Sequence, residues 1–116
     1  MRYVLVLMGL LAMPAAAQAE FAQVTDRERF VSLIEGRDLT RFGIRLEVTK
    51  DGQIRGRAFG RDVTGAWRWA QGYFCRDLYW GSMELGANCQ AVRQNGDTLR
   101  FISDQGQGQY ADLYLR

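Results

Sequence analysis

Apolar and polar side chains alternate with a period of two along most of the chain. The pattern is clearest at 43–49 (GIRLEVT), and it recurs at 53–59 (QIRGRAF) and 63–69 (VTGAWRW). Successive side chains of a β-strand point to opposite faces, so this alternation predicts strands with one buried and one solvated side. Two of the three tryptophans, Trp67 and Trp69, fall in the apolar phase, and we predict both in the core.

Four further stretches have the composition of short strands. They cover 73–80, 89–93, 98–103 and 109–116. The pair Asn95-Gly96 between two of them is a strong β-hairpin signal. About seven strands with short connections and no helical crossover predict antiparallel neighbours, because parallel pairs need a long connection.

One helix is predicted near the start, at 24–36 (VTDRERFVSLIEG). Thr25 is the expected N-cap, and Glu28 three residues later completes a capping box. Phe30 and Ile34 lie on one narrow apolar face, which must pack on other elements because a helix of about ten residues does not persist alone. The predicted fold class is therefore α+β, with one short N-terminal helix packed on an antiparallel β-meander, or small curled barrel, of about seven strands with one disulfide.

Residues 1–19 have the form of a secretory signal peptide. A positive start is followed by an apolar run at 4–13, and the small residues Ala17 and Ala19 frame a cleavage site. The apolar run is shorter than the roughly 20 residues that a transmembrane helix needs. We expect cleavage after Ala19, a single domain over 20–116, and a periplasmic protein with no transmembrane anchor.

Two cysteines, Cys75 and Cys89, lie in the exported part of the chain. An even pair in an oxidising compartment predicts a disulfide, which closes a loop of about 15 residues and contributes about 3 kcal/mol in the chain-entropy model. A free or metal-binding pair is the alternative. Because the chain has no histidine, a zinc site would have to use carboxylates. We expect no metal and no cofactor.

The composition argues against several functions. Without histidine there is no Ser-His or Cys-His pair for nucleophilic catalysis, and no glycine motif for phosphates or dinucleotides is present. Fifteen basic and 13 acidic residues nearly balance, so the net charge predicts neither nucleic acid nor a membrane surface as a partner. Asp77, in phase with Cys75, is either a perturbed acid in a pocket or the structural partner of an arginine, and we favour the structural interpretation.

The stretch 73–80 (YFCRDLYW) carries aromatic side chains on both faces. Phe74 and Trp80 lie in one phase, and Tyr79 lies in the other. Both sets belong to a core only if the strand is covered on both sides. Otherwise one set forms an exposed apolar patch that binds a partner. The candidate binding residues here are Phe74, Arg76, Tyr79 and Trp80.

Arginines form a second candidate surface. Arg45, Arg55, Arg57 and Arg68 point outward from three consecutive predicted strands. In register they would form a cationic patch that binds an anionic group, such as a lipid headgroup, a cell-wall polymer or an acidic protein loop. The alternative, which we favour, is a solvated face with ordinary cross-strand ion pairs.

The segment 51–90 contains a strand with a G-x-W pattern, the run GYFCR and a later NCQ. With these motifs the chain resembles short secreted proteins of alphaproteobacteria that have no established activity. Some of those proteins carry a dihydrodipicolinate reductase label. That chemistry is not expected here, because the nucleotide-binding glycine turn is missing and an exported compartment does not suit a nicotinamide cofactor. The resemblance therefore transfers no functional residues.

The sequence predicts a non-enzymatic periplasmic binding or accessory protein that acts through the aromatic face or the arginine-rich face. Its expected partner is another periplasmic protein or an anionic envelope component, and not a nucleic acid. The alternative is a β-barrel that binds a small ligand in its interior. A small hydrolase that uses a pair of carboxylates is the third hypothesis.

Overall fold

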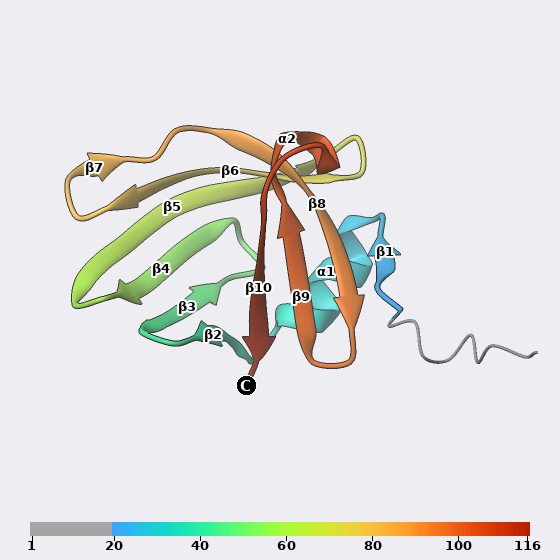
Figure 1. Cartoon of the computed structure of the whole chain (residues 1–116), viewed down its shortest axis with the longest axis horizontal. Coiled ribbons are helices and arrows are strands. Elements are labelled where there is room, and N and C mark those ends of the chain that lie inside the picture. Colours follow the sequence, from blue (N-terminus) through green and yellow to red (C-terminus); the bar gives the residue numbers. More distant parts are fainter. Residues whose placement is uncertain (1–19) are drawn as a thin grey trace, which may run out of the picture.

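The computed structural model describes residues 20–116, which form a closed antiparallel β-barrel (Figure 1). Eight strands form the ring, in the order β8-β9-β10-β2-β3-β4-β5-β6, and the pairing of β6 with β8 closes it. Two short strands lie outside the ring, where β1 pairs with β8 and β7 pairs with β6. The strands are β1 (Ala22–Val24), β2 (Asp38–Arg41), β3 (Ile44–Val48), β4 (Gln53–Ala58), β5 (Arg61–Ala70), β6 (Tyr73–Trp80), β7 (Met83–Glu84), β8 (Asn88–Asn95), β9 (Thr98–Ile102) and β10 (Tyr110–Leu115), and the helices are α1 (Arg27–Ile34) and the single turn α2 (Ser103–Gly106).

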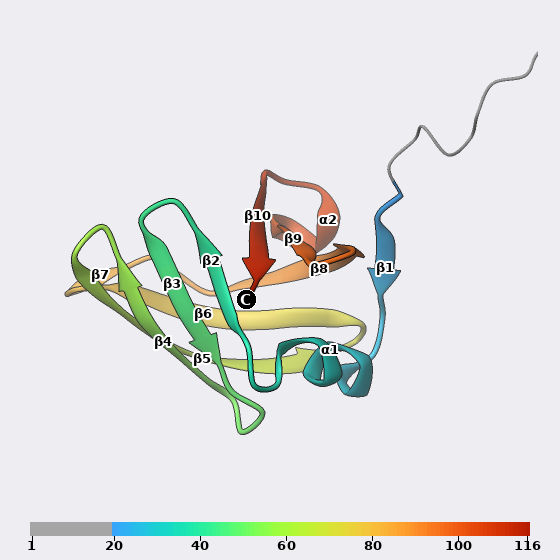
Figure 2. The same cartoon turned by 90° about the horizontal axis from the view of Figure 1, so that it is seen from below.

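The predicted fold class, α+β with a helix packed on a meander or curled barrel of about seven strands, is wrong. The described chain is mostly β, with only 12% helix and ten strands. The strands β1, β2 and β7 were not predicted, because they have only 3, 4 and 2 residues and such short stretches show no period. Among residues 20–116, no helical layer covers the sheet. Instead α1 lies at one end of the barrel (Figure 2).

The predicted alternation is confirmed in the strands β3 to β5. Trp67 is 6% exposed and Trp69 is half-buried, whereas Arg55 and Arg57 are exposed. The pairing of β4 with β5 sets Gly56 opposite Val63, so the small and the large inward positions face each other across neighbouring strands. The barrel wall therefore has the dry inner side and the wet outer side that the sequence pattern predicts.

An aromatic cluster around Phe30 of α1 fills one end of the barrel. Phe30 is 0% exposed. Its ring centroid lies 5.2 Å from that of Trp67, 5.1 Å from that of Phe74 and 6.3 Å from that of Phe101. The helix begins one residue later than predicted, since Asp26 rather than Thr25 is the N-cap and accepts a hydrogen bond from the Arg29 amide at 2.8 Å. This end of the barrel is closed by side chains.

The disulfide between Cys75 and Cys89 is confirmed. The two cysteines face each other in register on β6 and β8, the pair of strands that closes the ring. The expected signal peptide, 1–19, lies outside the described residues. Within 20–116, no helix is long and apolar enough to cross a membrane.

Candidate functional site

The interior of the barrel contains a cavity of about 190 Å³. Side chains from seven of the eight ring strands line it, and most of them are apolar. Representative apolar lining residues are Leu39, Leu46, Ile54, Phe74, Phe101 and Leu113. The two polar lining residues are Arg76 and Gln90. A small barrel has space for one small ligand when its inner side chains do not meet at the axis.

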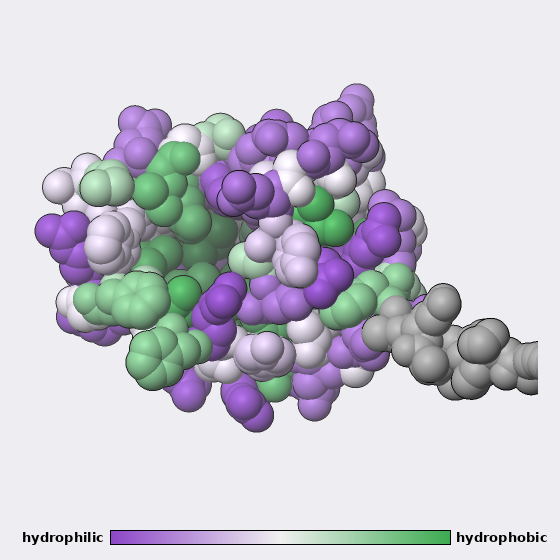
Figure 3. All heavy atoms as spheres, in the orientation of Figure 1, coloured by the Kyte–Doolittle hydropathy of each residue, from purple (hydrophilic) through white to green (hydrophobic). Residues whose placement is uncertain are grey.

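A second cavity, of about 340 Å³, opens at the end of the barrel away from α1. Its lining is entirely apolar and includes Phe59, Trp80 and Leu85. Leu46 and Leu78 line both this cavity and the interior one, so the two are neighbours. Figure 3 shows an apolar hollow in this region of the surface. Phe30 closes one end of the barrel, whereas the other end is an apolar mouth.

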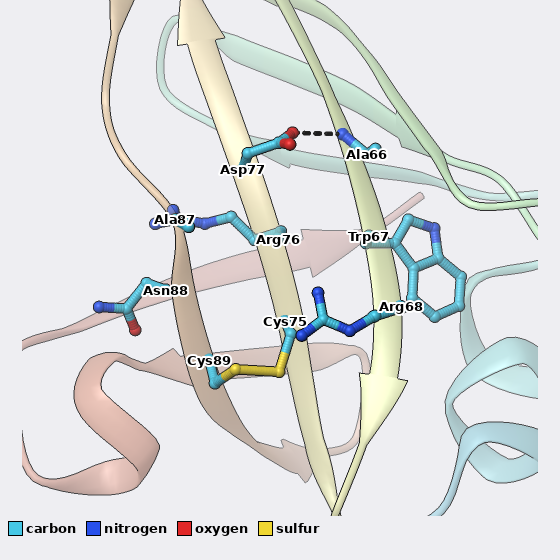
Figure 4. A pocket seen from close by; sticks show the side chains of 9 residues that line it. All are labelled: Ala66, Trp67, Arg68, Cys75, Arg76, Asp77, Ala87, Asn88 and Cys89. Atoms are coloured by element: carbon cyan, nitrogen blue, oxygen red, sulfur yellow. Dashed lines mark hydrogen bonds between the residues drawn. A yellow bond between two sulfur atoms is a disulfide. The ribbon is translucent and has the colours of Figure 1, made fainter.

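Arg76 lies in the wall of the interior cavity. It is opposite the buried Trp67 in the β5–β6 ladder, in the inward-facing phase. The β6–β8 ladder ends at Arg76 and Asn88, and the side chain crosses the gap that follows, where Nη1 donates a hydrogen bond to the Gly86 carbonyl oxygen at 2.7 Å. Figure 4 shows it extended from β6 toward Ala87. Arg76 therefore reaches from the apolar interior into a gap of the barrel wall.

The charge of Arg76 is only partly compensated by the protein. The residue is half-buried. Burial lowers the pKa of its guanidinium below the ordinary value, and the neighbouring Asp77 carboxylate opposes this shift. Among residues 20–116, no acidic side chain forms a salt bridge with Arg76. A guanidinium has five N–H donors, and the Gly86 carbonyl accepts from one of them. The site thus offers a bound molecule apolar surface and an incompletely paired cation.

Asp77 points to the outer face, on the same side as the disulfide, as predicted. Its Oδ1 accepts a hydrogen bond from the Ala66 amide at 2.9 Å (Figure 4). The predicted ion pair with an arginine does not form among the described residues. A backbone donor satisfies the carboxylate instead, so Asp77 has a structural role that holds β5 and β6 together.

The candidate aromatic residues are divided between the two faces of β6. Phe74 is 4% exposed and lines the interior cavity. Trp80 is half-buried in the mouth, and its Nε1 donates to the Ala58 carbonyl oxygen at 2.8 Å. Tyr79 lies on the outer face and is 38% exposed. The structure therefore joins Phe74 and Trp80 to Arg76 at the cavities, and it leaves Tyr79 apart.

The candidate arginines form no free cationic patch. Arg45 pairs with Asp38 at 2.6 Å, Arg55 with Glu47 at 3.2 Å and Arg57 with Asp62 at 2.7 Å. Each of these acids neutralises its arginine locally, and the pairs are solvated, so they attract an anionic partner weakly. Arg68 lies on β5 opposite Cys75 and lines a further hollow of the barrel wall, together with Arg76, Asp77 and the disulfide (Figure 4).

Sequence reasoning named only Trp80 among the residues that line the mouth, and the residues that it missed include Phe59 and Leu85. Phe59 lies in the turn between β4 and β5 with a φ of 51°, a conformation that bulky side chains rarely adopt. A phenylalanine directly before Gly60 in a tight turn is a visible signal, because turn positions favour Gly, Asn and Asp. Leu85 has no comparable signal, since it is brought to the mouth by the pairing of the two-residue strand β7 with β6 and by the hydrogen bond that its amide donates to the Leu78 carbonyl oxygen at 2.9 Å.

Comparisons with known proteins identify no relative of this chain. No protein-family model, curated protein or solved structure matches it. The resemblance to small secreted alphaproteobacterial proteins stays a prediction. A function for the chain therefore has to follow from the geometry and chemistry of its own residues.

Proposed function

We propose that this protein is a non-enzymatic binding protein that takes a small, mainly apolar molecule with one anionic group into its barrel. One observation carries the proposal: an apolar cavity, open at an apolar mouth, with the incompletely paired Arg76 in its wall. Ligand sites in proteins are commonly apolar hollows with a few polar groups that orient the ligand. This was the alternative hypothesis from the sequence.

The cavity supports this proposal better than docking on a sheet face. Phe74 and Trp80 were candidates for an exposed aromatic patch, but they line the two cavities. The outward arginines Arg45, Arg55 and Arg57 are each paired with an acid. These five candidates for docking on a sheet face are thus already engaged within the fold.

The two parts of the site would contribute differently to affinity. Transfer of an alkyl chain from water into the apolar cavity contributes about 0.8 kcal/mol per buried CH₂. A hydrogen bond between Arg76 and an anionic oxygen contributes about 1.5–3 kcal/mol, since hydrogen bonds to charged groups are the stronger ones. The alkyl part supplies most of the affinity, and Arg76 supplies the preference for an acid over a neutral analogue.

The disulfide fits an extracellular or periplasmic protein, because such bonds persist in oxidising compartments. We place the protein in the periplasm, reached through cleavage of 1–19, and regard the ligand as an anionic envelope component or a product derived from one. A single-chain carboxylate is the simplest molecule with this chemistry. Its carboxylate group matches the planar fork of N–H donors of a guanidinium.

A comparison of decanoate with decanol tests the proposal directly. The two probes share their alkyl chain, and only the first is anionic. We expect the wild-type chain to bind decanoate about 10- to 100-fold more tightly than decanol, which corresponds to one charged hydrogen bond. Trp80 lines the mouth, and the Trp67 ring centroid lies 5.5 Å from that of Phe74, which lines the interior cavity. Tryptophan fluorescence is therefore the readout, with calorimetry as a second measurement.

The variant Arg76→Met should remove this preference and keep the affinity for decanol. Arg68→Met is the matched control, because it removes an arginine from the outer face of the adjacent strand. Failure of the wild-type chain to bind either probe would reject the proposed function. Equal binding of both probes, or an unchanged preference in Arg76→Met, would reject the role of Arg76 while leaving an apolar binding site in place.

A further inference from the structure

Two phenylalanines lie exposed at the tips of neighbouring hairpins. Phe42, between β2 and β3, is 92% exposed, and Phe59, between β4 and β5, is 62% exposed. Met83 and Leu85, beside the β6–β7 connection, are each 50% exposed. These connections lie at the same end of the barrel, opposite α1 (Figure 1). We call Phe42, Phe59, Met83 and Leu85 the apolar rim.

The rim is one continuous feature. The Phe59 amide donates a hydrogen bond to the Gly43 carbonyl oxygen at 2.8 Å, and a Cβ at Gly43 would overlap the Phe59 ring. The two hairpin tips are thus in contact. Phe59 and Leu85 both line the apolar mouth, which connects the tips to the β7 side of the opening. Phe59 and Leu85 therefore place the rim at the entrance to the cavity.

The conformation of Phe59 argues that the rim has a purpose beyond folding. Its positive φ is unfavourable for a side chain of this size, and Gly or Asn would fit the turn better. Because 62% of Phe59 is exposed, burial of its side chain within the protein offsets little of this conformational cost. Residues that break a local rule without a folding benefit tend to mark functional positions.

The charges beside the rim indicate the kind of partner. Arg41 directly precedes Phe42, and Arg61 follows Phe59 after one glycine. Both arginines are exposed, and neither forms a salt bridge with an acid of the described chain. Arg61 lies over the Trp80 ring, 4.8 Å from its centroid. One acid, Glu84 on β7, lies between the exposed Met83 and Leu85 in the chain.

We propose that the apolar rim docks on the surface of an anionic lipid bilayer, with Phe42 and Phe59 at headgroup level and Arg41 and Arg61 against lipid phosphates. Aromatic rings favour the membrane–water interface, and arginines near an anionic leaflet are attracted to it. Guanidinium groups bind phosphate oxygens as a fork. The docked mouth faces the lipid, so an apolar ligand enters the barrel without crossing water. Docking itself requires no ligand and can be measured without one.

Sedimentation with lipid vesicles tests the docking. Residues 20–116, which contain the whole barrel, its core and its disulfide, are mixed with vesicles of phosphatidylcholine alone or with added phosphatidylglycerol. We expect binding to the anionic vesicles, weaker binding to the neutral ones, and a decline as salt rises. The double variant Phe42→Ser/Phe59→Ser should lose at least tenfold in partitioning, and Arg41→Gln/Arg61→Gln should lose the preference for anionic vesicles.

Tyr110→Ser is the matched control, because Tyr110 is 59% exposed on β10 and lies outside the rim. It should bind vesicles as the wild type does, and circular dichroism should show all variants folded. Absence of vesicle binding by the wild type, or wild-type binding by the Phe42/Phe59 variant, would overturn the proposal. A wild-type dimer in light scattering that the same variant converts to monomer would overturn it too, because a second copy would then cover the rim.

Discussion

At the scale of single residues, glycines decide how closely the strands of the wall approach. Gly56 on β4 lies opposite Leu46 of β3 and Val63 of β5. A Cβ at this position would overlap the Arg45 carbonyl oxygen and lie 2.8 Å from the Leu46 Cα, both of which are backbone atoms. No side-chain rotation can relieve such a contact, so glycine is required at this position of the wall.

Gly56→Ala should therefore destabilise the barrel by about 1–3 kcal/mol through overpacking. Gly36→Ala is the matched control, since Gly36 has a φ of +76° but no heavy atom within 4 Å of an added Cβ. That variant should cost about 1 kcal/mol from backbone strain alone. Urea unfolding measures both values, and a smaller loss for Gly56→Ala than for Gly36→Ala would contradict the steric argument.

At the scale of elements, the seam between β6 and β8 turns a sheet into a barrel. Only three residue pairs form this ladder, and the disulfide is the central one. Beyond Arg76 the two segments separate, and the hydrogen bond from Arg76 to Gly86 spans the opening. The same seam thus closes the ring and positions the cation of the proposed site.

The double variant Cys75→Ser/Cys89→Ser should lose about 3 kcal/mol of stability, because the disulfide keeps a loop closed in the unfolded chain and so lowers its conformational entropy. Denaturant unfolding of the wild type with and without a reductant gives the same comparison in one protein. The reductant should have no effect on the variant. A wild type that is equally stable in both states would show that the ladder closes the ring without the covalent bond.

At the scale of the whole molecule, the two ends of the barrel differ. Phe30 and its aromatic neighbours close one end, and the other end keeps an open apolar mouth. The interior between them includes Ala111 on β10, a small side chain that lines the cavity. The space for a ligand is thus a property of the assembled ring and not of any one strand.

Ala111→Leu should fill part of this space. Decanoate affinity should fall about tenfold or more, whereas stability should stay equal or rise by about 0.5–2 kcal/mol, as cavity-filling changes often do. In the wild type, decanoate at 100 times its Kd should add about 2.7 kcal/mol of stability by mass action. Thermal unfolding with and without decanoate measures both effects. Undiminished affinity in Ala111→Leu would show that the ligand binds outside the interior cavity.

Part of the fold and little of the site could be predicted from sequence. The inward Trp67 and outward Arg55 follow from alternation, and the Cys75–Cys89 bond follows from an even cysteine pair in an exported chain. Arg76 was a candidate binding residue, but it was grouped with Tyr79, which lies on the opposite face of β6. The alternation pattern assigns residues to the two faces of a strand, but it does not show which face becomes the interior of a closed barrel.

The sequence by itself determined the strand-rich character, the antiparallel neighbours, the two sides of β3 to β5 and the disulfide. These depend on side-chain order over a few residues, or on one covalent pair, and such information is local. The tertiary structure alone decided that the sheet closes, that α1 closes one end of the barrel instead of covering the sheet, and that the hairpin tips that carry Phe42 and Phe59 are in contact. Those features come from pairings between strands that are distant in the sequence, such as β10 with β2 and β6 with β8. The free energy of such a pairing depends on both strands together, so it cannot be inferred from one local stretch of sequence.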